Sequence, residues 1–262
     1  MSTRSKISLT VLVSLLFMAV LPSLAHNDPW RQTTDNRNAW LMFFGNARLS
    51  ERFGLNSEIQ WRRADYFNNP QQLLLRTGVN VHLGQTITLT AGYCFVETYP
   101  YGSFPVRSTF PENRLWEQLH LRNVIGKTEW IARFRLEQRF SRLPVESSVE
   151  PGTFNSGDAV YTNRFRVMNR FSIPFKGSEI LDYSLYFSIY DELFINFGHN
   201  VEGNVFDQNR AYAALGYVVP RLGRVEFGFM EQTLLKPDGR RLENNHTIYV
   251  SLISKFDFRS RD

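Results

Sequence analysis

The chain is dominated by an alternation of apolar and polar residues with a period of two. In one segment, Trp130, Ala132, Phe134 and Leu136 alternate with charged residues. Comparable patterns cover residues 39–49, 55–62, 73–83, 87–95, 113–124, 160–173, 181–195, 208–219, 224–235 and 246–258. No stretch after residue 25 keeps a helical period over three turns. The pattern therefore predicts an all-β chain whose strands each carry one apolar face.

The length of these strands decides between two all-β architectures. Strands of soluble sandwiches usually run about five or six residues, whereas these run roughly ten to fourteen, the length that a tilted strand needs to cross a bilayer. In a membrane barrel the apolar face meets lipid and the polar face lines the inside. We therefore expect a single antiparallel, up-and-down transmembrane β-barrel.

The connections between the strands alternate in length. Short links are expected at 50–52, 84–85, 125–127, 175–178 and 220–223, and longer ones at about 63–71, 97–112, 141–159, 196–207 and 236–245. Membrane barrels have this asymmetry, with short periplasmic turns and longer outer loops. Aromatic residues also crowd the strand ends, as expected for interfacial girdles.

Eleven strands are evident from Ala39 onward. Antiparallel closure needs an even number, so the expectation is 10–12 strands, with twelve preferred and ten second. A twelfth strand would come from residues 26–38, which are read as an irregular N-terminal segment or a first strand. The barrel itself is placed at 39–258, followed by a C-terminal tail at 259–262.

Residues 1–25 have the pattern of a cleaved secretory signal peptide. Arg4 and Lys6 precede an apolar stretch at 7–21, and small residues Ser23 and Ala25 suit the peptidase. Without this segment, 28 basic and 25 acidic residues remain, so the formal net charge falls from +5 to +3. The arginines alternate with apolar residues and form no basic helix, which argues against nucleic acid as a partner. The single cysteine, Cys94, indicates a fold held without disulfides.

The polar faces of the strands form the candidate site. If they point inward, opposed Arg and Glu side chains lie about 5 Å apart on neighbouring strands and must be paired. The proposed lumen network is Glu112, Arg114, Gln118, His120, Arg133, Arg135, Glu137, Arg139, Arg164, Arg166, Glu192, Asn196, Asp207, Gln208, Arg210 and Glu226. It either fills a narrow lumen or, through its excess of arginine, binds or passes a small anionic solute.

Catalytic groupings are poorly developed. No metal-site spacing of histidines and no Gly-x-Ser-x-Gly turn occurs in the sequence. His246 and Ser251 are five residues apart, which puts them on opposite strand faces. No catalytic residue, metal ligand or cofactor is therefore assigned. A lipid-modifying outer-membrane enzyme stays open as an alternative, recognisable by a Ser–His pair in hydrogen-bond reach, as does a soluble periplasmic barrel that binds an apolar ligand.

Five blocks of the sequence stand out: Glu112-x-Arg114-x-Trp116-x-Gln118-Leu119, Arg133-Phe134-Arg135-Leu136-Glu137-Gln138-Arg139, Asp191-Glu192-Leu193-Phe194-x-Asn196, Phe206-Asp207-Gln208-Asn209-Arg210 and Leu215-Gly216-Tyr217. These blocks give the chain a resemblance to the bacterial family DUF2490. It covers about residues 39–257. It implies an exported β-barrel of Gram-negative bacteria, Bacteroidetes-like in style, with no established activity and no catalytic residues. It also implies a shared inner network of Glu112, Arg114, Glu137, Arg139, Glu192, Asn196, Asp207, Gln208 and Arg210.

The combined expectation is an outer-membrane β-barrel that is structural, or porin-like with a narrow path or binding site for a small anionic solute. Its other expected partners are membrane lipid and the outer-membrane insertion machinery. Barrels commonly end on an aromatic residue that this machinery reads, whereas here Phe258 is followed by the tail 259–262.

Overall fold

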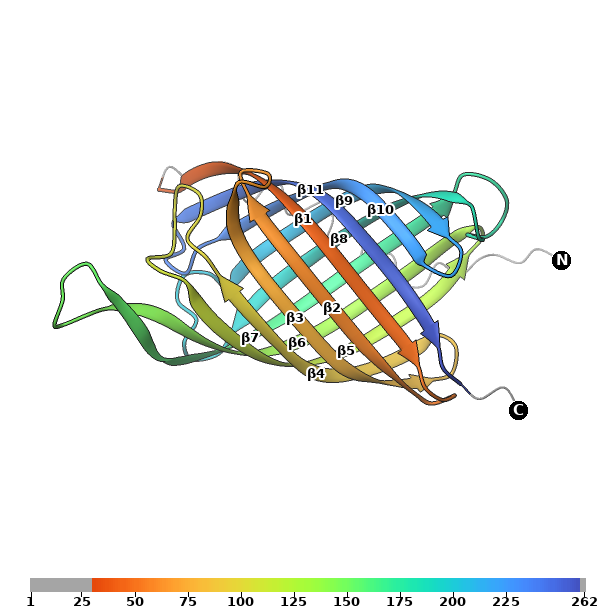
Figure 1. Cartoon of the computed structure of the whole chain (residues 1–262), viewed down its shortest axis with the longest axis horizontal. Coiled ribbons are helices and arrows are strands. Elements are labelled where there is room, and N and C mark those ends of the chain that lie inside the picture. Colours follow the sequence, from red (N-terminus) through yellow and green to blue (C-terminus); the bar gives the residue numbers. More distant parts are fainter. Residues whose placement is uncertain (1–29, 260–262) are drawn as a thin grey trace.

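A computed structural model describes residues 30–259 and contains one closed β-barrel (Figure 1). Its strands are β1 (Gln32–Arg48), β2 (Phe53–Ala64), β3 (Asn69–Leu83), β4 (Ile87–Thr98), β5 (Phe110–Ile125), β6 (Thr128–Glu146), β7 (Phe154–Pro174), β8 (Leu185–Phe197), β9 (Phe206–Val219), β10 (Gly223–Leu235) and β11 (Arg241–Asp257). The expected signal peptide at 1–25, residues 26–29 and residues 260–262 of the tail lie outside the described residues. No helix that could span a membrane occurs among residues 30–259.

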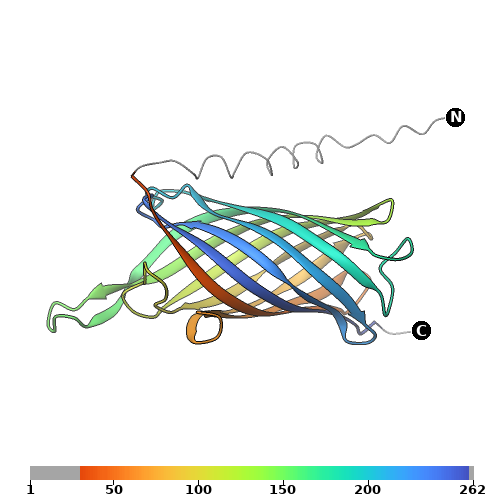
Figure 2. The same cartoon turned by 90° about the horizontal axis from the view of Figure 1, so that it is seen from above.

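The barrel closes through a parallel pair of strands. Consecutive strands pair antiparallel, but β1 pairs with β11 in parallel, from Gln32 opposite Arg241 to Arg48 opposite Asp257. Figure 2 shows these two strands side by side. The expected range of 10–12 strands is confirmed, with eleven in place of the preferred twelve. An even number is required only when every pair is antiparallel, and residues 32–38 lengthen the first strand instead of forming another.

The two ends of the barrel differ. One end carries the links 65–68, 99–109, 147–153, 198–205 and 236–240 and the extended hairpin of β6 and β7, which projects to the left in Figure 1. The other end, called here the short-turn end, carries 49–52, 84–86, 126–127, 175–184 and 220–222 and the end of β11. Two expected links were wrong: the loop placed at 141–159 shortens to 147–153 because β6 and β7 extend into it, and the turn placed at 175–178 extends to 184. Tyr183 has a positive φ of 60° there, and its N–H donates to the Val218 carbonyl, so this stretch turns before β8 begins.

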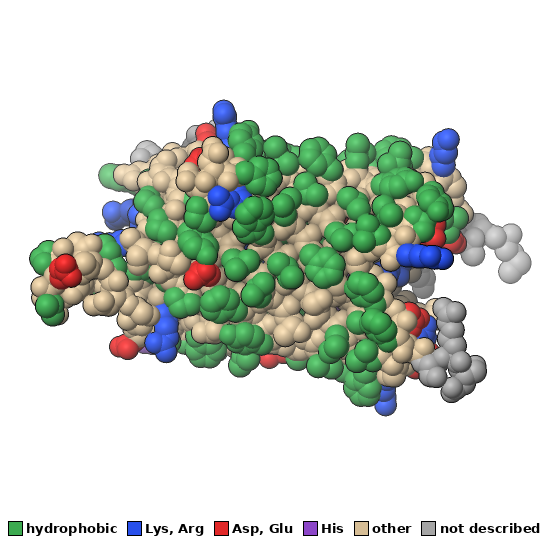
Figure 3. Space-filling model, in the orientation of Figure 1, with side chains coloured by type: hydrophobic (Ala, Val, Ile, Leu, Met, Phe, Trp, Pro, Cys, Tyr) green, Lys and Arg blue, Asp and Glu red, His purple; other side chains and the backbone are tan. Residues whose placement is uncertain are grey.

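Alternation along the strands gives the barrel two different faces. On β4, for example, Leu89 and Tyr93 are exposed on the outer wall, whereas Thr90 and Cys94 are buried inside. Figure 3 shows the outer wall covered with apolar side chains in this view, with charged side chains mainly toward its two ends. The inner face carries most of the buried charged residues. The period-two pattern therefore places apolar groups outside and polar groups inside.

One glycine pair allows the largest inner side chain of this region to fit. Gly78 and Gly92 lie opposite each other on β3 and β4, and Gly92 lies opposite Trp116 on β5. A Cβ on Gly78 would lie 2.8 Å from Trp116 Cζ2 and 2.8 Å from the Ala91 carbonyl oxygen. Glycine at these inward positions therefore makes room for the buried indole.

Candidate functional site: the charged interior

The sixteen residues predicted for the lumen network all belong to the inner side of the barrel wall. Register puts them opposite one another in rows, such as Arg114 opposite Arg139 and Glu137 opposite Arg164. Asp207 reaches the interior at a bulge in the pairing of β8 with β9. Asn196 also faces inward, but its amide donates to the Asn204 carbonyl at 3.0 Å and so anchors a loop. The structure brings the other members together as described below, except that His120 and Glu226 lie nearer the short-turn end.

Glu137 on β6 is the centre of the network and is fully buried. Arg164 donates to its Oε2 through Nε at 3.0 Å and Nη2 at 2.6 Å. Arg166 Nη1 donates to Oε1 at 2.8 Å, and Arg76 Nη2 from β3 does so at 3.1 Å. Arg114 Nη1 lies 3.7 Å from Oε2. One carboxylate therefore joins guanidinium groups from three other strands, β3, β5 and β7.

Two further carboxylates extend the network around the lumen. Glu112 accepts hydrogen bonds from Arg114, from Arg139 (Nε to Oε1, 2.8 Å) and from Ser141. Glu192 on β8 accepts from Arg133 at 2.7 Å and from Arg166 Nε at 2.9 Å.

Smaller links complete this part of the interior. Arg164 Nη1 also donates to Asp207 at 2.8 Å, and Arg135 donates twice to the Gln118 amide oxygen, at 3.0 and 2.7 Å. Such mutual pairing is what buried charges require in order to be tolerated.

Positive charge exceeds negative charge inside the barrel. Twelve arginines on inward rows (Arg62, Arg76, Arg114, Arg122, Arg133, Arg135, Arg139, Arg164, Arg166, Arg170, Arg210 and Arg224) face eight carboxylates (Glu58, Glu112, Glu129, Glu137, Glu192, Asp207, Glu226 and Glu243). Within residues 30–259, Arg62 and Arg210 form no ion pair. Arg62 donates to Gln60 and Gln72, and Arg210 donates to Gln208. The buried Nη1 of Arg135 has no hydrogen-bond partner there.

Aromatic rings lie against several of these guanidinium groups. The Trp40 ring centroid is 3.9 Å from Arg62 Cζ and 5.1 Å from Arg210 Cζ. The Phe194 ring is 4.3 Å from Arg166 Cζ and 4.7 Å from Arg210 Cζ. Cation–π attraction offsets part of the cost of burying these cations, and it is stronger away from water. Arg166 also has carboxylate partners, whereas the ring contacts leave Arg62 and Arg210 without an ion pair among residues 30–259.

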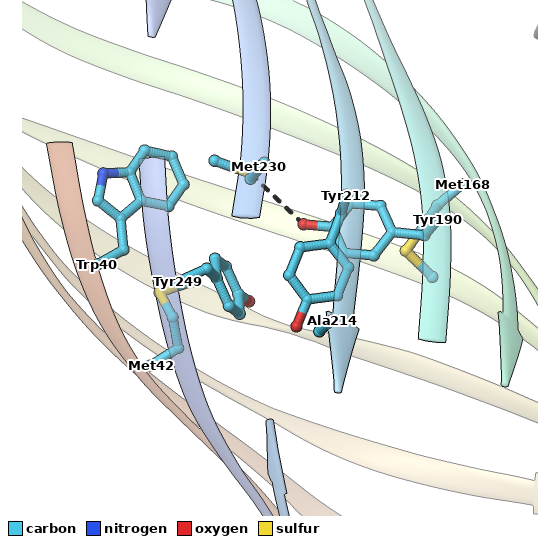
Figure 4. Packing of buried hydrophobic residues seen from close by; sticks show 8 residues of the cluster. All are labelled: Trp40, Met42, Met168, Tyr190, Tyr212, Ala214, Met230 and Tyr249. Atoms are coloured by element: carbon cyan, nitrogen blue, oxygen red, sulfur yellow. Dashed lines mark hydrogen bonds between the residues drawn. The ribbon is translucent and has the colours of Figure 1, made fainter. Parts of the chain in front are cut away.

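Beside the ionic network, an apolar cluster crosses the lumen (Figure 4). Its members are Trp40, Met42, Met168, Tyr190, Tyr212, Ala214, Met230 and Tyr249, with Phe44 and Ile131 packed against it. These residues come from β1 and β6–β11, so the cluster reaches across the barrel. Tyr190 stacks on Tyr212 with ring centroids 4.5 Å apart. The cluster fills the lumen with side chains at this level.

Glu226 connects the apolar cluster to the short-turn end of the lumen. It accepts hydrogen bonds from Tyr186 at 2.6 Å and Tyr212 at 3.0 Å, and it is paired with Arg170. Beyond it, Arg224 on β10 binds Glu129 on β6 through Nη1 at 2.7 Å and Nη2 at 2.9 Å. Ion pairs of this kind connect non-neighbouring strands, here β6 and β10, across the lumen.

At the long-loop end, the loop 99–109 packs against the far side of the mouth. Tyr101 donates to Glu243 on β11 at 3.1 Å, and Ser103 accepts a hydrogen bond from Thr34 on β1 at 2.9 Å. Lys236 pairs with the same Glu243 at 2.7 Å. Burial, together with the Glu243 carboxylate, raises the pKa of the Tyr101 phenol above its usual range. The phenol therefore stays protonated and holds the loop across this mouth.

The positions of the histidine and hydroxyl side chains bear on the enzyme alternative. Among residues 30–259, the one hydrogen bond between a hydroxyl group and a histidine joins Thr88 Oγ1 and His82 Nδ1 at 3.2 Å. On the outer wall, His246 Nδ1 lies 2.7 Å from Glu231 Oε2, while Ser251 faces inward, so His246 and Ser251 do lie on opposite faces. Residues 30–259 contain no group of three or more His, Cys, Asp or Glu side chains arranged to hold a metal ion.

Sequence reasoning missed several inner residues of the site. Glu58, Arg62 and Arg76 occupy the polar positions of the alternating pattern, which was a usable signal. The inward tyrosines Tyr190 and Tyr249 had no such signal, because an aromatic residue suits lipid, an interface or a lumen equally well.

The fold and its interior define a closed β-barrel with a filled, positively charged lumen. The family described as "Protein of unknown function (DUF2490)" matches residues 37–243, and the chain belongs to this family. No curated protein and no solved structure matches the chain.

Proposed function

We propose that this protein is a β-barrel of a Gram-negative outer membrane whose closed, basic lumen holds a small anion. The membrane location is supported by the apolar outer wall and by strands of 12 to 21 residues, which exceed the nine to eleven or so that a bilayer requires. The signal-peptide pattern at residues 1–25 is consistent with export. In this arrangement the short-turn end faces the periplasm.

Two carboxylates on the outer wall are compatible with a lipid-facing surface because each is hydrogen-bonded. Asp191 accepts from the Asn209 amide at 3.1 Å, and Glu117 accepts from Gln138 at 3.1 Å. A polar group in hydrocarbon is costly mainly when it lacks a partner.

The observation that carries anion binding is the surplus of guanidinium groups inside the barrel. Arg62 and Arg210 lie against the same Trp40 ring without an ion pair among the described residues. Two buried like charges repel, and a buried charge without a counter-ion is strongly destabilising. A small anion next to these groups would lower that cost. The filled lumen favours binding over free passage.

Membrane extraction and conductance test this proposal. After membranes are washed with carbonate or urea, the protein should stay in the pellet and be released only by detergent. Release by buffer or salt would contradict the membrane location and favour a soluble periplasmic barrel. In a planar bilayer the purified protein should give no steady channel current, because side chains cross the lumen. A stable ohmic conductance would contradict a closed lumen.

A further inference from the structure

Basic side chains from several strands gather at the short-turn end of the lumen. This basic cup consists of His120 and Arg122 on β5, Arg224 on β10 and Lys255 on β11, with Glu129 on β6. All five belong to the inward rows of their strands: Arg224 is opposite Ile253, and Lys255 is the next inward residue after Ile253. The cup is therefore assembled by the closure of the barrel, not by a local motif.

One carboxylate serves two guanidinium groups in the cup. Arg224 binds Glu129 at 2.7 and 2.9 Å, and Arg122 Nη2 lies 3.2 Å from Glu129 Oε1. Lys255 forms no ion pair within residues 30–259, and its ammonium group interacts electrostatically with Arg122, Arg224 and Glu129. With His120 counted as neutral, the cup contains three cations (Arg122, Arg224 and Lys255) and one anion (Glu129).

The cup is also accessible to solutes. The Arg122 side chain is 40% exposed, whereas Glu129 is 11% exposed, and Lys255 lies in the exposed last part of β11. Farther in, the tyrosine and methionine cluster fills the lumen. A solute that enters from this end therefore meets donors of Arg122 and Lys255 first, and it cannot move deeper without displacing packed side chains.

We propose that the basic cup binds the phosphate group of a small solute. Two surplus positive charges match a phosphate dianion, and a guanidinium beside an ammonium supplies several N–H donors for its oxygens. Chloride carries only one charge, and it lacks the separate oxygen atoms that let phosphate accept hydrogen bonds in several directions. This inference rests on the proposed function, because it names where an anion first binds and which chemical class it belongs to.

The test is calorimetric titration of the purified protein in detergent. Inorganic phosphate and glycerol 3-phosphate are compared with chloride at equal ionic strength. Phosphate should bind, and Arg122→Gln/Lys255→Gln should weaken it at least tenfold. The control is Lys127→Gln/Lys176→Gln, which removes the same charge from turns at the same end and should bind like the wild type. Binding of the ester as tightly as the free ion would indicate a larger phosphorylated ligand, and preference for the free ion would indicate phosphate itself.

Further variants separate the failure of this inference from failure of the proposed function. Lys255→Gln alone leaves no carboxylate without its partner, so it tests the cup even if the double variant does not fold. Equal phosphate binding in the wild type and in Lys255→Gln would contradict phosphate binding at the basic cup. If binding were lost instead in Arg62→Gln/Arg210→Gln, the anion would lie deep in the lumen. Anion binding by the barrel would then stand, and only its assignment to the cup would be wrong. If the wild type bound no anion at all, both anion claims would fail, whereas the membrane location is decided separately by extraction.

Discussion

Arg76 on β3 donates to Glu137 on β6 across 3.1 Å, although two strands, β4 and β5, separate them in the barrel wall. The contact is made through the lumen, so the interior network holds together strands that share no backbone hydrogen bonds. The stability of the barrel should therefore depend on Glu137 more than on any exposed acidic residue.

Substitution Glu137→Gln should lower the free energy of unfolding by about 3–5 kcal/mol, because it leaves several buried guanidinium groups without their carboxylate. Urea titration, followed by the folded band on a detergent gel, measures the change. Glu150→Gln, in the exposed link between β6 and β7, is the control and should change stability by less than about 0.5 kcal/mol. Equal effects of the two substitutions would contradict a central role for Glu137.

The outer wall gives a second prediction. Phe134→Arg, well inside an outward row, should cost about 2–4 kcal/mol in a bilayer, since a lipid-facing guanidinium must be dehydrated, and Leu89→Arg, at the third residue of β4, should cost less. Val149→Arg, at a loop position that is 90% exposed, should be neutral. Folding titrations into lipid vesicles provide the values. A neutral result at both wall positions would mean that these faces do not contact lipid.

The closure of the barrel can be tested by cross-linking. Leu41 on β1 lies opposite Val250 on β11, and residues paired in this way are close enough for a disulfide. In a background in which the free Cys94 is replaced by alanine, Leu41→Cys/Val250→Cys should form an intramolecular disulfide on oxidation. The offset pair Leu41→Cys/Ser254→Cys should not, because Ser254 lies opposite Gly45. Cross-linking is read as a changed migration of the unreduced, denatured chain. Failure of the first pair would contradict eleven-strand closure.

The fit of Trp116 against Gly78 yields a prediction about packing. Gly78→Ala should destabilise the barrel by about 1–3 kcal/mol, since the added methyl group overlaps the indole and a neighbouring carbonyl. Trp116→Phe in the same chain should recover part of this loss, because the smaller ring vacates the contact. Unfolding titrations of both single variants and the double variant measure the coupling. Strictly additive effects would show that the two side chains do not compete for space.

The period-two pattern was sufficient to predict an all-β barrel and the inward polar faces. Strand alternation is a local property, and a residue such as Glu137 or Arg164 can be assigned to a face from its immediate neighbours. The pairing of β1 with β11 could not be predicted in this way, because it joins the two ends of the chain. The side chains of residues 32–38 are all polar, so they show no alternation that would mark this segment as a strand.

The site was predictable in kind but not in its details. Which arginine lacks a carboxylate depends on register around the whole barrel, and Arg62 and Arg210 come from strands that contact each other only through the lumen. The longer link at 175–184 was missed because Leu181 and Tyr183 continue the alternation of β8 before that strand begins.

Cell fractionation, combined with gel migration before and after boiling, tests the central claim most directly. A membrane-embedded, closed barrel should be recovered in the outer-membrane fraction. Its unboiled form should migrate differently from the boiled form, because a closed barrel resists unfolding by detergent. Recovery in the soluble periplasmic fraction, with the same migration before and after boiling, would contradict this account.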